Sequence, residues 1–216
     1  MHLTVRLCIA LLIVSAGGCL GLNPGVDIRD GPVLIPTLRA TFDIGDSELD
    51  AESGKPAPGD SRSAIELTVS GASGNDAGVD YRIVQTTVAL DGRLVREKTW
   101  SLDVLFGGGY IDFDLSTAGL DHDYNDIGLF GGLQLDWKAK HRLTPYARYS
   151  LMAGLFTSVS HQVEIGVSYA ISRNVRLLGA YRFWKFQEED FFVIFGPGTD
   201  IDLEIHGLVL GVEFKF

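Results

Sequence analysis

Apolar and polar residues alternate along much of this chain. In the last stretch, "GLVLGVEFKF", every second residue from Leu208 to Phe216 is apolar, and Gly, Val, Glu and Lys stand between them. Successive side chains of an extended strand point to opposite faces, so this stretch predicts a strand with one wholly apolar face. The same period of two recurs upstream, whereas helical periodicity is confined to the first twenty or so residues.

The alternation predicts an all-β fold with eight strands. Glycine and acidic loops separate some of them, and the Asp91–Gly92 pair is typical of a tight hairpin turn. The segment 33–43 also alternates, and we expect it to be an N-terminal piece that does not belong to the set. Ten strands are the alternative, if this segment is a strand and the glycines at 107–109 divide the long third one. The eight expected strands are 64–70, 81–90, 99–113, 127–138, 144–156, 159–170, 175–186 and 201–216.

The face opposite the apolar stripes indicates on which side of the sheet water lies. It mixes both signs of charge with Gly and Ser, as in a narrow polar lumen where charges pair, and we expect a network of Asp136, Arg148, Glu164, Arg176, Arg182 and Glu213 there. Aromatic residues stand near the ends of the apolar stripes, as girdles do at a membrane interface: Trp137, Tyr169, Phe183 and Phe216. The pattern therefore favours apolar side chains outside and charges inside.

The first residues have the layout of an export signal. One Arg precedes an apolar run, and small residues lead to Cys19, so we expect 1–18 to be a signal peptide. The sequence "AGGC" resembles the lipobox of bacterial lipoproteins, although Ala16 stands where Leu is commonest. This resemblance implies lipidation of Cys19, and Leu20 in place of Asp implies onward transport to the outer membrane. The alternative is a plain export signal, in which Cys19 has no role. Residues 19–32 then form a tether, and 33–216 form the barrel domain.

From 64 to 216 the chain resembles the small outer-membrane β-barrel proteins of Gram-negative bacteria, the OmpA-type and OmpW-type group. The terminal alternation that ends on an aromatic residue resembles the signal read by the barrel assembly machinery, which implicates Phe214 and Phe216. The resemblance implies an antiparallel up-and-down transmembrane barrel in the outer membrane. Its implied partners are outer-membrane lipid, lipopolysaccharide and the assembly machinery.

Charge and motifs narrow the chemistry. The net charge of −10 without a basic patch argues against a nucleic-acid partner. "DHDYND" at 121–126 fails the calcium-loop pattern, because Asp126 stands where Gly is needed. "SVSHQ", with His161, lacks the His-x-Ser order of lipid A-modifying barrels, and His206 has no obvious acid and nucleophile beside it. We expect no enzyme activity, no metal site and no cofactor.

The expected role is structural or interactive, in the cell envelope. The loop 188–200 holds an apolar run between acidic residues, which is a hypothesis for an extracellular partner. Two alternatives stay open. One is a narrow channel for small solutes, and the other is a soluble lipocalin-like lipoprotein that binds an apolar ligand.

Overall fold

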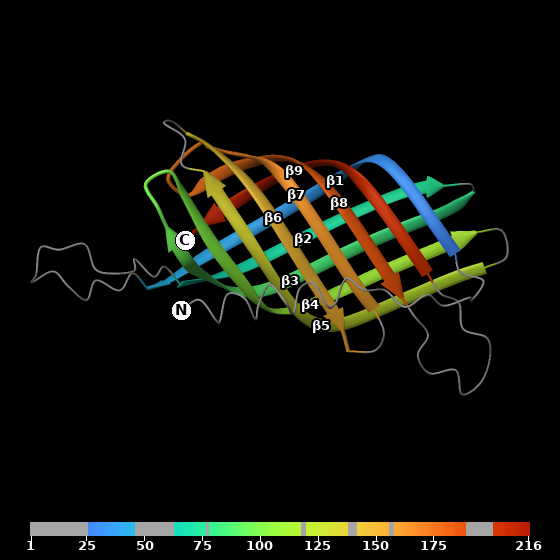
Figure 1. The fold of residues 1–216 in the computed structure, drawn as a ribbon. Helices are drawn as coiled ribbons and strands as arrows, with labels where there is room; N and C mark the ends of the chain where they lie inside the picture. Colours follow the sequence, from blue (N-terminus) through green and yellow to red (C-terminus); the bar gives the residue numbers. More distant parts are fainter. Residues whose placement is uncertain are drawn as a thin grey trace, which may run out of the picture.

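Nine β-strands close into a barrel in the computed structural model, which describes residues 26–45, 63–76, 78–117, 120–137, 142–155, 158–188 and 201–216 (Figure 1). The all-β barrel is confirmed, but the expected count of eight strands, or ten, is wrong. The described residues contain no helix with the length and apolar character needed to cross a membrane. The strands are β1 (Val26–Gly45), β2 (Ser63–Asp76), β3 (Val79–Arg96), β4 (Trp100–Thr117), β5 (Leu120–Trp137), β6 (Leu143–Gly154), β7 (Ser158–Ala170), β8 (Val175–Glu188) and β9 (Ile201–Lys215).

Strand β1 closes the barrel by pairing with both β2 and β9. It runs antiparallel to β2 and parallel to β9, with pairs from Val26–Ile201 to Thr41–Lys215. A closed up-and-down sheet with an odd number of strands needs one parallel pair, and this is it. The segment 33–43 is therefore a full member of the wall, because without it β2 and β9 would each leave an unpaired edge.

The position of β1 also changes two expected boundaries. The strand begins at Val26, inside the segment 19–32 that the sequence suggested as a tether. Because β1 is parallel to β9, its first residue lies at the end of the barrel opposite Phe216. Both ends of the barrel domain would lie on one side only with an even number of antiparallel strands, such as the expected eight.

The long third and fourth strands pass through residues that the sequence suggested as breaks. Asp91 and Gly92 pair with Leu105 and Val104 inside the β3–β4 ladder, and the turn falls at 97–99, where the Glu97 amide donates to the Trp100 carbonyl at 2.8 Å. Gly92 has no positive φ, so it does not make the hairpin turn that the Asp-Gly pair favours. Strand β4 likewise continues through the glycines at 107–109.

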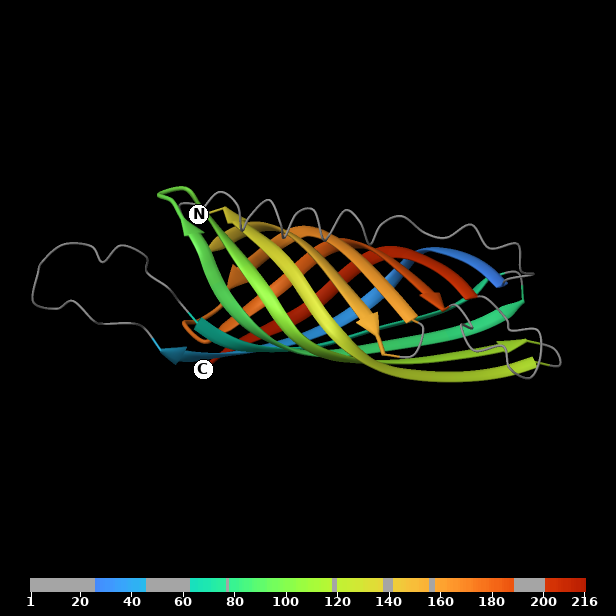
Figure 2. The ribbon, with the colours of Figure 1, turned by 60° about the horizontal axis from the view of Figure 1, so that its bottom comes forward.

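The hairpin of β4 and β5 extends beyond its neighbour β6. Strand β5 begins at Leu120, so most of the acidic stretch 116–126, which lies between two of the expected strands, belongs to β4 and β5. β6 pairs only with residues 128–136 of β5, which leaves the first part of β5 beyond the end of β6 (yellow-green in Figure 2). Figures 1 and 2 also show that the strands are inclined to the axis of the barrel.

The outer surface is apolar over the half of the barrel nearest Phe216. The outward side chains there carry no charge among the described residues, and many are well exposed, with Leu210 at 59% and Phe216 at 65%. We call this surface the apolar belt. It consists of the outward residues, every second one, within 34–44, 65–71, 84–94, 102–110, 127–137, 143–155, 159–171, 175–183 and 208–216.

The outer surface becomes polar at the other end, and the change takes place within two residues on a strand. Toward this end, the outward residue next to Val84 on its strand is Arg82, the one next to Tyr110 is Asp112, and the one next to Phe183 is Lys185. We call this second surface the polar cap. Its outward side chains, mostly acidic, include Asn75, Arg82, Asp112, Asp114, Asp121, Asp123, Lys185, Asp202 and Glu204.

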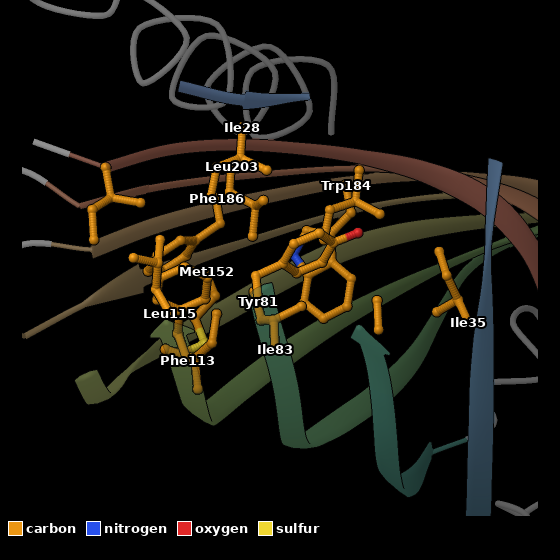
Figure 3. Close-up of a cluster of buried hydrophobic side chains, with 14 of the residues drawn as sticks. Ile28, Ile35, Tyr81, Ile83, Phe113, Leu115, Met152, Trp184, Phe186 and Leu203 are labelled. Carbon is orange, nitrogen blue, oxygen red and sulfur yellow. The ribbon is translucent and has the colours of Figure 1, made fainter. Parts of the chain in front are cut away.

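The interior has the opposite arrangement. Inside the polar cap lies an apolar core built from several strands, with Phe113, Trp184, Phe186, Leu203 and Ile205 fully buried (Figure 3). Inside the apolar belt the buried side chains are mainly Arg, Glu, Thr, Ser and Gln. The polarity of the wall therefore reverses about half-way along the barrel, on the inside and on the outside together.

Candidate functional site in the barrel lumen

Five charged side chains from five strands meet inside the apolar belt. They are Arg39 of β1, Glu66 of β2, Arg148 of β6, Glu164 of β7 and Arg182 of β8, and each is at most 7% exposed. We call them the central cluster. Each occupies an inward position because the neighbouring residues along its strand, apolar or small, face out.

The two carboxylates of the central cluster are well supplied with hydrogen bonds. The Arg148 guanidinium donates to Glu66 Oε1 at 2.6 Å, and the Thr68 hydroxyl donates to the same oxygen at 2.9 Å. Arg182 Nε donates to Glu164 Oε2 at 2.7 Å, its Nη2 contacts the same oxygen, and the Tyr146 hydroxyl donates to Oε1 at 2.5 Å. Charge-assisted bonds of this kind are what allow a carboxylate to remain ionised away from water.

Arg39 lies between the two carboxylates without a hydrogen bond to either. Its Nε is 3.7 Å from Glu66 Oε2, and its Nη2 is 3.8 Å from Glu164 Oε1. The guanidinium carbon also lies 6.0 Å from the centre of the Tyr146 ring. Arg39 therefore joins the pairs electrostatically, while its N–H groups stay available to another acceptor.

Three of the six charges predicted from the sequence belong to this cluster, namely Arg148, Glu164 and Arg182. Asp136 is joined to it through Gln134, which donates to Asp136 at 3.0 Å and accepts from Arg148 at 3.4 Å. Arg176 and Glu213 lie apart as a looser pair, 4.0 Å from nitrogen to oxygen. Glu213 also faces the Lys215 ammonium at 3.3 Å.

Sequence reasoning missed Arg39, Glu66 and the partly buried pair of Arg93 with Asp103, whose atoms are 2.8 Å apart. The alternation in 33–43 already placed Arg39 opposite Leu38, so the signal was present. It was not used because the segment was not counted as part of the barrel wall. Glu66 lies between Ile65 and Leu67, so the same alternation predicts that its side chain faces the lumen.

The lumen is filled along the described strands. Beside the central cluster a cavity of about 20 Å³ lies among Arg39, Arg148, Arg182, Phe130 and neighbouring polar side chains. A volume of this size holds one or two water molecules at most. Toward the polar cap, Trp184 is fully buried, and its indole N–H donates to the Ser160 hydroxyl at 2.9 Å. Trp184 packs within the apolar core that fills this end of the lumen (Figure 3).

The histidines that the sequence singled out both contact tyrosines on the outer face. His161 Nδ1 lies 3.0 Å from the Tyr149 hydroxyl, and His206 contacts the Tyr181 hydroxyl. On β9, His206 stands between outward Leu208 and Glu204, where the outward residues change from apolar to polar, whereas on β7 His161 lies within the apolar belt, between Val159 and Val163. Amphipathic rings of this kind suit a boundary between an apolar and a wet environment.

An acidic group on the polar cap lies outside the lumen. Oxygens of Asp112, Asp114 and Asp123 lie within 4.8 Å of one another, and Arg82 pairs with Asp114 at 2.5 Å and with Asp112 at 3.2 Å. The hydrogen bond between Asp123 and Asp114 raises the pKa of Asp123 and lowers that of Asp114, and Arg82 lowers the latter further. Asp123 therefore takes up a proton before Asp114 as the pH falls, and Arg82 balances part of the acidic charge.

The two terminal aromatic residues named as an assembly signal lie on the apolar belt. Phe216 stacks on Phe42 of β1 with ring centres 5.0 Å apart, and Phe214 lies 6.4 Å from Phe216. The Phe216 amide also donates to the Thr41 carbonyl at 2.9 Å. Cys19 and residues 189–200 of the loop 188–200 lie outside the described residues.

Comparison with known proteins gives no family assignment. No family model matches the chain, and neither a curated protein nor a solved structure is significantly similar to it.

Proposed function

We propose that this protein is an outer-membrane β-barrel of a Gram-negative bacterium, with a closed lumen and a structural or interaction role in the cell envelope. The observation that carries the proposal is the reversal of polarity along the wall. An apolar outer surface that surrounds a charged interior is favourable where the surroundings are hydrocarbon. A polar outer surface around an apolar core is favourable in water. This barrel has both arrangements, the first at the end nearest Phe216 and the second at the opposite end.

The height of the apolar belt fits a membrane. On most strands it covers nine to eleven residues, as in 84–94, 127–137 and 208–216. At about 3.3 Å per residue and a tilt of about 40°, such segments rise roughly 23–28 Å. The apolar band of outer-membrane barrels is about 25 Å tall.

The soluble carrier is the weaker alternative because its polarity would be the reverse. A lipocalin-like protein places its apolar residues around an internal ligand cavity and its polar residues outside. Here the cavity beside the central cluster measures only about 20 Å³ and is lined by three arginines. The exposed apolar belt would cover far more surface than the few hundred Å² that a soluble monomer commonly exposes.

A narrow channel is also less well supported than a closed barrel. Barrels of about eight strands have interiors that their own side chains fill, and water-filled pores need many more strands. Nine strands, a salt-bridged central cluster and the apolar core agree with a closed lumen. A role through contacts is favoured, with membrane lipid and lipopolysaccharide around the belt and an extracellular partner at the cap and the loop 188–200.

Membrane insertion can be tested with two spin-labelled variants in a chain whose Cys8 and Cys19 are replaced by Ser. Leu210→Cys places the label on the apolar belt, and Asn75→Cys places it on the polar cap; both side chains are exposed. In lipid vesicles, oxygen concentrates in hydrocarbon and a nickel chelate stays in water. We expect the label at 210 to collide mainly with oxygen and the label at 75 mainly with the chelate.

The position 75 variant is the matched control, because it reports an exposed site on the same wall. If both labels collide mainly with the nickel chelate, or if the protein stays in solution without detergent, the belt is not in lipid and the proposal is wrong.

A further inference from the structure

The small cavity in the lumen has a lining of unusual charge. Three guanidinium groups border it, from Arg39, Arg148 and Arg182, together with hydroxyl and amide groups such as those of Thr87, Ser150 and Gln162. No carboxylate lines it, and Glu66 and Glu164 pair with Arg148 and Arg182 without belonging to its lining. The cavity therefore lies in a region of positive potential.

The charges around the cavity do not balance. The central cluster holds three arginines and two glutamates, which leaves one positive charge over. Two further carboxylates lie nearby: Asp136 reaches the cluster only through Gln134, and Glu213 already faces Lys215 at 3.3 Å and Arg176 at 4.0 Å. A buried charge without a counter-charge is costly, so an anion in the cavity would stabilise the cluster.

Hydrogen-bond donors without acceptors also favour an anion in the cavity. Among the described residues, Arg39 Nε and Nη2 and Arg182 Nη1 are buried and have no hydrogen-bond partner. Both residues line the cavity and are 2% exposed. Buried N–H groups almost always make a hydrogen bond in folded proteins, and the nearest carboxylate oxygens lie 3.7 and 3.8 Å from Arg39 Nε and Nη2, so these donors can accommodate a further acceptor.

We propose that the cavity binds one small monovalent anion of the halide class, such as chloride. The ion would accept hydrogen bonds from Arg39 and Arg182 and would neutralise the remaining positive charge. The volume of about 20 Å³ admits an ion little larger than water and excludes sulfate and phosphate. A single water molecule could accept some of these bonds, but it would leave the charge unbalanced. The site depends on the lumen alone, whatever surrounds the barrel.

The central cluster borders the cavity and the apolar core occupies the cap half of the lumen, so the anion is supplied while the barrel folds. The protein is therefore unfolded in urea and refolded into detergent micelles with sodium bromide as its only salt. Crystals of this material are measured at the bromine absorption edge. We expect one anomalous peak within hydrogen-bond reach of Arg39 and Arg182. Density without anomalous signal, which would be water alone, overturns the proposal.

A second measurement follows stability in solution. Thermal unfolding is recorded at constant ionic strength while gluconate, too large for the cavity, is replaced by chloride. We expect the midpoint of the wild-type protein to rise steadily with the logarithm of chloride concentration. Arg39→Gln removes one lining guanidinium and should abolish this rise. Arg93→Gln breaks the partly buried pair with Asp103, which does not line the cavity, and this variant should keep the rise.

A wild-type midpoint that does not change with chloride contradicts the proposal. If Arg39→Gln does not fold, Thr87→Val tests the lining with a near-isosteric change, and its chloride response should fall while its midpoint in gluconate stays close to that of the wild type. Equal chloride responses of Thr87→Val and the wild-type protein would remove the cavity as the binding site.

Discussion

Arg182 is the residue whose pairing holds the central cluster together most directly. Its guanidinium binds Glu164 and reaches the Thr37 hydroxyl of β1 at 3.4 Å, so it links β7 and β8 to the closing strand. Buried pairs add little net free energy compared with apolar packing, but an unpaired buried charge is strongly unfavourable. The consequence of removing Arg182 therefore depends mainly on what happens to Glu164.

Arg182→Met should destabilise the barrel by about 3–5 kcal/mol, because Glu164 would lose its main counter-charge while 2% exposed. The double variant with Glu164→Gln should recover part of this loss, since it removes the stranded charge. Urea unfolding in micelles measures both. Arg176→Met is the control: its side chain is 30% exposed and its pair is 4.0 Å long, so the expected loss is below about 1 kcal/mol. Equal losses for Arg176→Met and Arg182→Met would contradict this account.

At the residue scale, the sequence could give the direction of a side chain but not its partner. Arg148, Glu164 and Arg182 follow from the alternation within their own strands, because outward apolar neighbours fix them as inward. The pair of Arg148 with Glu66 joins residues 82 positions apart, on strands β6 and β2 that are not neighbours. Such a pair depends on how the wall closes, which no local pattern contains.

At the scale of the strand, the phase of the alternation carries more information than its presence. In β9 the apolar residues occupy odd positions from Ile201 to Ile205 and face in, whereas from Leu208 to Phe216 they occupy even positions and face out. In β4 the change runs from outward Phe106 to inward Phe113. The belt half of each strand could be predicted because its apolar stripe is unbroken. The cap half is harder to predict, because many of its outward residues are Asp or Asn, which are also typical of loops.

The parallel β1–β9 pair depends on close approach of two backbones at glycine. A methyl group on Gly211 would overlap the Thr37 carbonyl oxygen across the seam, whereas a methyl group on Gly179 in β8 would meet nothing within 4 Å. Gly211→Ala should therefore destabilise the barrel by about 1–3 kcal/mol through overpacking. Gly179→Ala should change stability by no more than about 0.5 kcal/mol.

Both glycine variants can be compared by urea unfolding and by the heat-dependent shift of the folded barrel in SDS gels. Gly211→Ala should lose the fast-migrating folded band at a lower temperature than the wild-type protein, and Gly179→Ala at nearly the same temperature. If the two variants behave alike, the β1–β9 seam is not closely packed, and β1 would contribute less to closure than its ladder with β9 indicates.

At the scale of the whole molecule, strand number and closure are set by contacts between distant parts of the chain. β1 and β9 lie at opposite ends of the sequence, and their pairing alone decides between an open sheet of eight or nine strands and a closed barrel. Local alternation predicts that a segment is a strand, but it does not indicate with which other strands the segment pairs. This is why the fold class could be predicted from the sequence while the count and the parallel seam could not.

Closure also decides what the lumen can do, and this gives the last prediction. The wild-type protein in planar lipid bilayers should produce no reproducible unit conductance, because the central cluster, Trp184 and the apolar core fill the lumen in series. Trp184→Ala is the decisive comparison. Any current that passes through the lumen must pass Trp184, so a true wild-type pore would gain conductance in this variant. Steps of the same size in both proteins would come from outside the lumen, whereas steps that grow on removal of Trp184 would make the protein a narrow channel.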